Sequence, residues 1–253
     1  KGLDWGGLHG RTEATGYGIV YFAECMLKAH GEDFKGKKVA ISGFGNVSWG
    51  TASKLEELGA IPITISGPDG YILDEEGVLG EKIDYLLELR ASGKNICKPY
   101  ADKFKSAKFI EGKKPWEVKA DMYIPCATQN EILIDDAKAI VASGAKYVCE
   151  GSNMSSSNEA IEYMLNNGII LGPSKAANAG GVACSCIEMG QNSGKTVFKP
   201  EQVHAQLKDI MVNIHDAAKN AAEEYGYGYN LVAGANIAGF LKVADSMIAQ
   251  GCV

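Results

Sequence analysis

The chain has 253 residues, of which 46% are hydrophobic and 22% charged, and its formal net charge is −6. This length and composition exclude a disordered or fibrous chain and allow one large domain or two small ones. The acidic balance argues against nucleic-acid binding, which needs a basic surface. No apolar run approaches a membrane span of roughly 20 residues, and the first residues lack a signal-peptide pattern. We therefore expect no nucleic-acid or membrane partner, and a cytoplasmic location.

Alternating strand-like and helix-like segments follow an opening helix. They predict an α/β fold with a doubly wound, mostly parallel sheet, flanking helices on both faces and a helical C-terminal segment. In chain order, we predict a helix over 15–30, a strand over 38–42, a helix over 46–58, a strand over 61–66, a helix over 81–91, strands over 108–110 and 122–126, a helix over 135–143, a strand over 147–150, a helix over 158–167, a strand over 169–171, and helices over 175–193, 200–224 and 233–250.

Cysteine usage gives no sign of a metal site. The seven cysteines include no CxxC pair, and the four histidines are not spaced to complete a zinc site with Cys184 and Cys186. We expect no metal, and we expect the cysteines to act as small buried side chains in a reducing compartment.

A glycine-rich loop lies between the first predicted strand and the next helix, with the sequence Gly43-Phe44-Gly45-Asn46-Val47-Ser48. Gly43 permits a tight turn, and Gly45 lets the backbone approach a pyrophosphate, which the helix N-terminus attracts. Ser48 replaces the third glycine of the usual pattern. The loop predicts a Rossmann-like dinucleotide-binding domain; the alternative is a tight turn without a ligand.

The second predicted strand ends at Ser66 and Gly67, without the acid that usually contacts the ribose there. The nearest acid, Asp69, lies in a Pro-Asp-Gly turn and is explained equally well by turn chemistry. Asp69 would disfavour the 2′-phosphate of NADP, whereas Gly67 leaves room for it, and Arg90 or Lys82 could supply positive charge. The choice between NAD and NADP stays open.

Several segments resemble the small hexameric glutamate dehydrogenases, within the Glu/Leu/Phe/Val dehydrogenase superfamily. They occur in the family's order over nearly the whole chain, although Thr12, Ser48, Ser152 and the His9-Gly10 pair depart from the family pattern. The segments are RTEATGYG (11–18), GFGNVSWG (43–50), PCATQN (125–130), EGSNM (150–154), PSKAANAGGV (173–182), EMGQN (188–192) and GANIAG (234–239).

The resemblance implies the C-terminal, NAD(P)-binding part of a two-domain subunit. We expect residues 1–193 to form that domain, and residues 194–253 to form helices that pack back toward a substrate domain preceding the chain. The catalytic lysines and aspartate would lie in that domain, so we assign no catalytic residue here and expect the chain to be inactive alone. The full-length enzyme would be a homo-hexamer that converts L-glutamate reversibly to 2-oxoglutarate and ammonium.

Site residues follow from these motifs. The resemblance implies that Ser185 binds the side-chain carboxylate of the substrate and that Val182 makes an apolar contact to the substrate. The alternatives are a helix cap for Thr15, loop hydrogen bonding for Thr128 and a bond from Ser185 to its own helix backbone. The predicted cofactor contacts are Thr15, Gly43, Gly45, Asn46, Val47, Ser66, Gly67, Ala127, Thr128, Asn153 and Asn178.

Two other functions compete with this prediction. A leucine, phenylalanine or valine dehydrogenase would share the architecture, but the hydroxyl of Ser185 suits a side-chain carboxylate better than an apolar side chain. A non-catalytic nucleotide-binding module would account for the missing catalytic residues.

Overall fold

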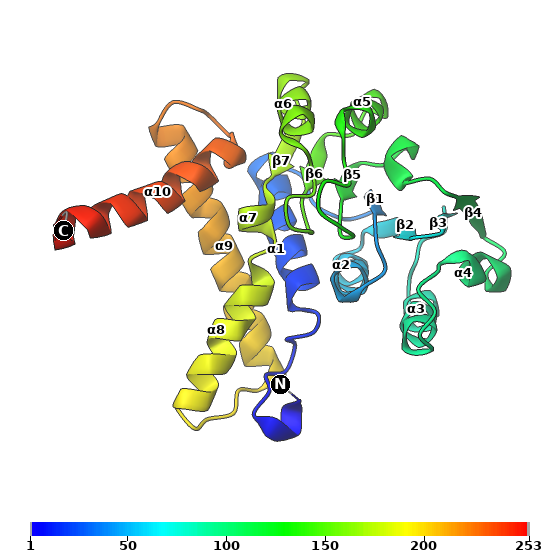
Figure 1. The fold of residues 1–253 in the computed structure, drawn as a ribbon, viewed down its shortest axis with the longest axis horizontal. Helices are drawn as coiled ribbons and strands as arrows, with labels where there is room; N and C mark the ends of the chain where they lie inside the picture. Colours follow the sequence, from blue (N-terminus) through cyan, green and yellow to red (C-terminus); the bar gives the residue numbers. More distant parts are fainter. Residues whose placement is uncertain (1, 252–253) are drawn as a thin grey trace.

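The strands form one seven-stranded sheet, in the order β4-β3-β2-β1-β5-β6-β7, in the computed structural model, which describes residues 2–251 (Figure 1). β2, β1, β5, β6 and β7 pair in parallel, whereas β3 is antiparallel to both β2 and β4. The mostly parallel sheet confirms the predicted fold class. The strands are β1 Lys38–Ile41, β2 Ile61–Gly67, β3 Gly70–Asp74, β4 Ala107–Glu111, β5 Met122–Ile124, β6 Tyr147–Cys149 and β7 Ile170–Gly172.

The central strands β1 and β5 are buried at every position after Lys38, because both faces of the sheet are covered. Successive side chains of a strand point to opposite faces. Val39 and Ile41 therefore enter one hydrophobic core, and Ala40 enters the other. Met122 and Ile124 alternate with Tyr123 in the same way.

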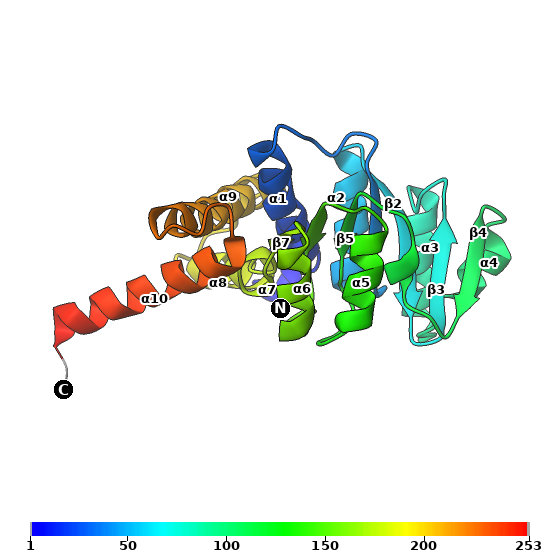
Figure 2. The same cartoon turned by 90° about the horizontal axis from the view of Figure 1, so that it is seen from above.

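Helices cover the two faces of this sheet (Figure 2). The first face carries α1 Ala14–Ala29, α2 Asn46–Glu57 and α3 Glu81–Ala91, and the second carries α5 Ile134–Ala142 and α6 Asn158–Asn166. The short helix α4 Lys98–Lys103 packs beside β3 and β4. Two 3-10 turns, η1 Leu3–Trp5 and η2 Pro115–Glu117, complete this part, and η2 packs against α5.

The remaining helices are α7 Ser174–Ala177, α8 Gly180–Ser193, α9 Pro200–Glu224 and α10 Leu231–Gln250. Glycines let α1 and α8 approach closely: a Cβ on Gly180 would lie 2.4 Å from the carbonyl oxygen of Ala14. This contact brings the start of α8 to the edge of the sheet. Leu207 and Met211 of α9 lie in the same hydrophobic core as α1. The predicted division between 1–193 and 194–253 stays a prediction.

The structure corrects several predicted elements. β3 and α4 were not predicted, and the single helix predicted over 175–193 is two helices separated by Asn178 and Ala179. The strand predicted over 122–126 ends at Ile124, because Pro125 has no N–H to continue the pairing. The prediction that the cysteines are buried is wrong for Cys186, which is exposed, and for Cys25, which is half-buried. Cys252 lies outside the described residues.

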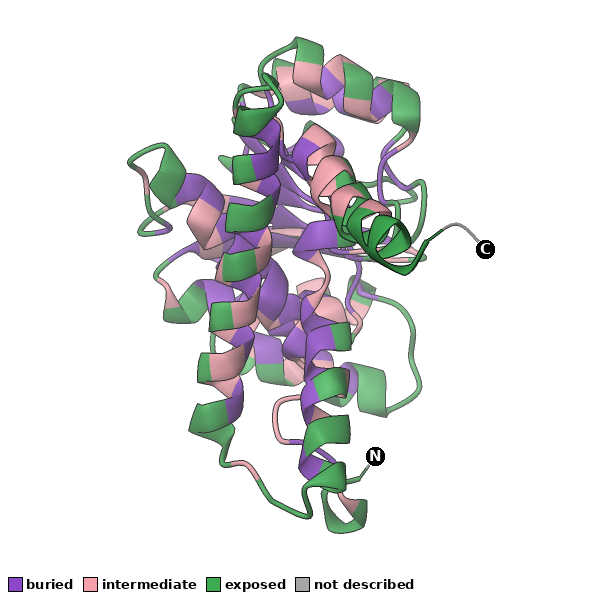
Figure 3. Cartoon of the chain, turned by 90° about the vertical axis from the view of Figure 1, so that its left-hand side faces the viewer, coloured by how far each residue is buried: buried purple, intermediate pink, exposed green. Residues whose placement is uncertain are grey.

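The statement that no segment approaches a membrane span is wrong for α10. Its 20 residues are long and apolar enough to cross a membrane, judged by length and composition alone. The helix buries Leu231 and Gly234 near its start, and its later part is largely exposed, with Phe240 and Ile248 on its surface (Figure 3). Lys242 and Asp245 interrupt the apolar run of this helix, so its uncharged stretch is shorter than the helix itself.

Candidate dinucleotide-binding site

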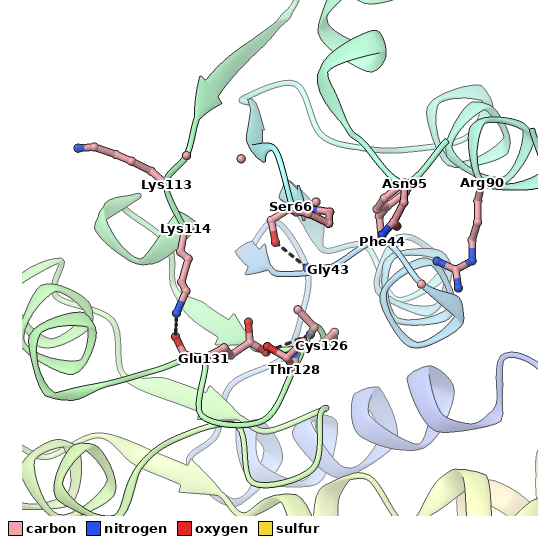
Figure 4. A pocket seen from close by; sticks show the side chains of 16 residues that line it. Gly43, Phe44, Ser66, Arg90, Asn95, Lys113, Lys114, Cys126, Thr128 and Glu131 are labelled. Atoms are coloured by element: carbon pink, nitrogen blue, oxygen red, sulfur yellow. Dashed lines mark hydrogen bonds between the residues drawn. The ribbon is translucent and has the colours of Figure 1, made fainter. Parts of the chain in front are cut away.

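A cavity of about 560 Å³ opens where the loops after β1, β2 and β5 meet at one edge of the sheet (Figure 4). Parallel strands end at the same edge, and ligands of open α/β sheets bind there. Six predicted cofactor contacts line this cavity, namely Gly43, Gly45, Ser66, Gly67, Ala127 and Thr128.

The glycine loop is built as the sequence suggested. Gly43 has a φ of 73°, in the left-handed region that favours glycine. Its N–H donates to Ser66 Oγ at 2.7 Å. Ser48, in place of the third glycine, is buried and donates to the carbonyl of Ser42 at 2.9 Å. The serine is therefore used to fasten α2 to the end of β1.

The start of α2 leaves backbone donors for a ligand. Its N-cap residue is Gly45, which makes no side-chain hydrogen bond. A Cβ on Gly45 would meet no protein atom nearer than Arg90 Nη1, at 3.6 Å. The fold therefore does not need a glycine there, whereas a closely bound pyrophosphate would. Of the two cations proposed to help, Arg90 lines the cavity, but Lys82 is bound to Asp74 at 2.8 Å instead.

Asp69 is occupied by the chain itself. Its carboxylate accepts hydrogen bonds from the N–H groups of Cys97 and Lys98, each at 3.0 Å. The Cys97 thiol lies 3.4 Å from the same carboxylate, and its pKa is raised to about 12 by burial and by the Asp69 charge. Asp69 thus ties the β2–β3 turn to the start of α4, in agreement with a structural interpretation of this acid.

A second cavity of about 690 Å³ adjoins the first, since Cys126 and Ala127 line both. It gathers residues from the start of α1, from the loops after β5 and β6, and from α8. Asn178 Nδ2 donates to Asn153 Oδ1 at 2.8 Å across its wall. The predicted residues that line it are Thr15, Val47, Ala127, Asn153, Asn178, Val182 and Ser185. Asn46, with Val47 and Thr15, lines a further cavity of about 680 Å³ beside the N-terminal loop.

Ser185 makes two hydrogen bonds within the chain. Its hydroxyl accepts from Arg11 Nε at 3.0 Å and donates to the carbonyl of Gly181 at 3.1 Å. The second bond is the helix interaction weighed as an alternative, and the first was not predicted. Arg11 lines the second cavity and is the one cation among the described residues that form its wall. The sequence could have indicated a role for Arg11, because this residue opens the RTEATGYG segment.

Other cavity residues were also missed, among them Phe44, Asn95, Lys113 and Glu131. Glu131 directly follows the PCATQN segment, and its position beside that segment could have indicated a residue of the site. Burial raises the pKa of its carboxyl group, against the opposing effect of hydrogen bonds from Ser42 and the loop backbone. Within residues 2–251, no three His, Cys, Asp or Glu side chains are grouped to hold a metal ion.

Comparison with known proteins matches residues 6–251 to the family model Glutamate/Leucine/Phenylalanine/Valine dehydrogenase. The NAD-specific glutamate dehydrogenase of Clostridium symbiosum is 52% identical over 253 residues, which cover 99% of this chain and 56% of that protein. The NADP-specific glutamate dehydrogenase of Escherichia coli (strain K12) is 47% identical, over 100% and 56%.

Solved structures agree. A glutamate dehydrogenase superposes with a TM-score of 0.97 at 51% identity, covering 100% of this chain and 57% of the other. The Plasmodium falciparum glutamate dehydrogenase superposes with a TM-score of 0.97 at 42% identity, over 100% and 54%. The chain thus spans about half the length of the relatives that it matches. Together with the glycine loop and the adjoining cavities, these matches show that the chain belongs to the Glutamate/Leucine/Phenylalanine/Valine dehydrogenase family.

Proposed function

We propose that this chain is the dinucleotide-binding part of a glutamate dehydrogenase, which converts L-glutamate reversibly to 2-oxoglutarate and ammonium with NAD or NADP. The observation that carries the proposal is the pair of adjoining cavities. One is bordered by the uncapped start of α2, and the other contains Arg11 and Ser185.

The first cavity fits a dinucleotide. The backbone N–H groups at the start of α2 and the open space over Gly45 suit a pyrophosphate, and the Arg90 guanidinium adds positive charge. A bound nicotinamide would supply the hydride acceptor. Asn153 and Asn178 would then orient the groups that extend into the second cavity.

The second cavity fits an amino acid with a side-chain carboxylate. The Arg11 guanidinium and the Ser185 hydroxyl are hydrogen-bonded to each other, so one group orders the other. A guanidinium and a hydroxyl form charge-assisted hydrogen bonds with a carboxylate. Val182 is 64% exposed and supplies an apolar contact beside them. A leucine, phenylalanine or valine substrate would bring no side-chain carboxylate to the guanidinium of Arg11, which would keep only its hydrogen bond to Ser185 within this pair.

Cofactor preference stays open between NAD and NADP, since relatives named for each match the chain. The Asp69 carboxylate, which would disfavour the 2′-phosphate of NADP, accepts hydrogen bonds from the N–H groups of Cys97 and Lys98 and does not settle this preference. The homo-hexamer and the cytoplasmic location stay predictions.

Two measurements test the proposed function. Calorimetric titration of the purified chain with NADH and with NADPH should show binding of at least one. The chain alone should not turn over glutamate, whereas a chimera carrying the remainder of the Clostridium symbiosum enzyme should, and should prefer glutamate to leucine.

Failure of both dinucleotides to bind would contradict the proposal. Binding without turnover in a folded chimera would favour the non-catalytic nucleotide-binding module. A chimera that prefers leucine would favour the alternative dehydrogenases.

A further inference from the structure

Glu131 is a buried acid in the wall of the first cavity. It lies between β5 and α5 and is only 4% exposed. Its side chain points toward the space between the Gly43 loop and Thr128 (Figure 4). A buried carboxylate is costly unless hydrogen bonds compensate it, so its partners indicate its role.

One carboxylate oxygen holds two loops. Glu131 Oε1 accepts from the N–H of Ala127 at 3.0 Å and from the N–H of Thr128 at 3.3 Å. The hydroxyl of Ser152, in the loop after β6, lies 3.2 Å from the same oxygen and 2.9 Å from the carbonyl of Thr128. The acid therefore fixes the loop after β5 against the loop after β6.

The main chain of Glu131 adds a third segment. Its carbonyl accepts from Lys114 Nζ at 2.6 Å and from Trp116 Nε1 at 3.2 Å. Both donors belong to the segment between β4 and β5. One residue thus joins three stretches of chain around the cavity and sets the position of Ala127 and Thr128.

We propose that Glu131 is a positioning residue for the dinucleotide, because its carboxylate holds the Ala127 and Thr128 backbone in the shape that receives the cofactor. The inference rests on the proposed function. Glu150 is the matched comparison in this chain. It is 1% exposed and accepts from the N–H groups of Ser156 at 2.8 Å and Ser174 at 2.9 Å, but it lines neither of the two cavities.

The charge state of Glu131 gives a further test. Its raised pKa brings protonation closer to neutral pH, and a protonated carboxyl is a weaker acceptor for the N–H and hydroxyl groups that donate to it. The cations lining the same cavity are Arg90, Lys113 and Lys114. Burial raises the pKa of the Cys126 thiol, the other acid there, which keeps it neutral.

The experiment is a titration of the 253-residue chain with NADH between pH 5 and 8, with the melting temperature measured in parallel. Glu131→Ala should raise the Kd by about 10- to 100-fold, because two backbone donors lose their acceptor. Glu131→Gln keeps one acceptor oxygen and should raise it by about 3- to 10-fold. Glu150→Gln should change it by less than about twofold. Wild-type affinity should fall on acidification, whereas that of Glu131→Gln should not.

Two outcomes would overturn the inference: both Glu131 variants binding NADH within about twofold of wild type, or Glu131→Gln and Glu150→Gln weakening it equally. If Glu131→Ala does not fold, the affinity and pH profile of Glu131→Gln decide. Absence of NADH binding by the wild-type chain would contradict the proposed function itself.

Discussion

The β1–α2 loop and the β2–β3 turn lie at the same edge of the sheet but use their polar groups differently. At the start of α2, the N-cap Gly45 supplies no side-chain hydrogen bond. In the β2–β3 turn, the carboxylate of Asp69 is held by the N–H groups of Cys97 and Lys98. The first segment leaves donors for a ligand, whereas the second uses its acceptor within the chain. Whether a polar group already has a hydrogen-bond partner within the chain therefore identifies a binding site better than the position of its residue in a motif.

The same contrast holds within the β1–α2 loop. Gly43 has a positive φ, and a Cβ on it would lie 2.8 Å from Ser48 Oγ and 3.0 Å from the carbonyl oxygen of Cys126. Gly45 has a φ of −81° and open space around its Cβ position. The fold requires the first glycine, and the proposed ligand requires the second.

Gly43→Ala should have the largest effect, and on stability. Left-handed backbone and crowding against Ser48 and Cys126 together should lower the free energy of unfolding by about 2–5 kcal/mol. Chemical denaturation of the purified chain measures this. A loss below about 1 kcal/mol would show that the loop can rearrange, and would remove the distinction between the two glycines.

Gly45→Val should separate binding from folding. A side chain there would occupy the path of the pyrophosphate and should weaken dinucleotide binding by at least about 100-fold. Stability should fall by less than about 1 kcal/mol, since valine is only a poorer N-cap than glycine. Calorimetry and denaturation on the same sample give both numbers. Unchanged affinity in a folded variant would sink the assignment of this loop to the cofactor.

Ser185→Val tests a residue that serves both the fold and the proposed ligand. Its hydroxyl is hydrogen-bonded to Arg11 and Gly181 within the chain, and it also lines a cavity. In the active chimera, kcat/KM for glutamate should fall by about 10- to 100-fold through loss of a charge-assisted hydrogen bond. Activity on leucine should fall less, or rise. If the ratio of the two constants does not move, the serine serves only its own helix.

Glu131→Gln should have the smallest effect on stability, and a pH-dependent one. Burial raises the pKa of Glu131, so folding disfavours its charged form. The stability that this carboxyl contributes is fully present below the ordinary glutamate pKa of 4.5 and is lost as pH rises through the raised folded pKa. The unfolding free energy of the variant relative to wild type should therefore increase from pH 4 to 8. A difference that is constant with pH would contradict the raised pKa.

Patterns carried by neighbouring residues were predictable from the sequence. The helix predicted over 200–224 begins and ends as predicted, with Pro200 in its first turn. The β1–loop–α2 unit was predictable because its glycines, its apolar strand and its helix are contiguous. Every predicted cofactor and substrate residue lies on the wall of one of the three cavities, while the role of each stays a prediction.

Tertiary structure alone decided what depends on distant partners. β3 is a strand because its backbone pairs with β2 and with β4, where Tyr71 lies opposite Ile110. Asp69 meets a backbone N–H 28 residues away, and Arg11 meets Ser185 across 174 residues. Glu131 is buried in a cavity wall only because the loops that follow separate strands come together at one edge of the sheet. Local patterning sets which segments are helices and strands, but hydrogen-bond partners brought together by the sheet decide which polar groups remain for a ligand.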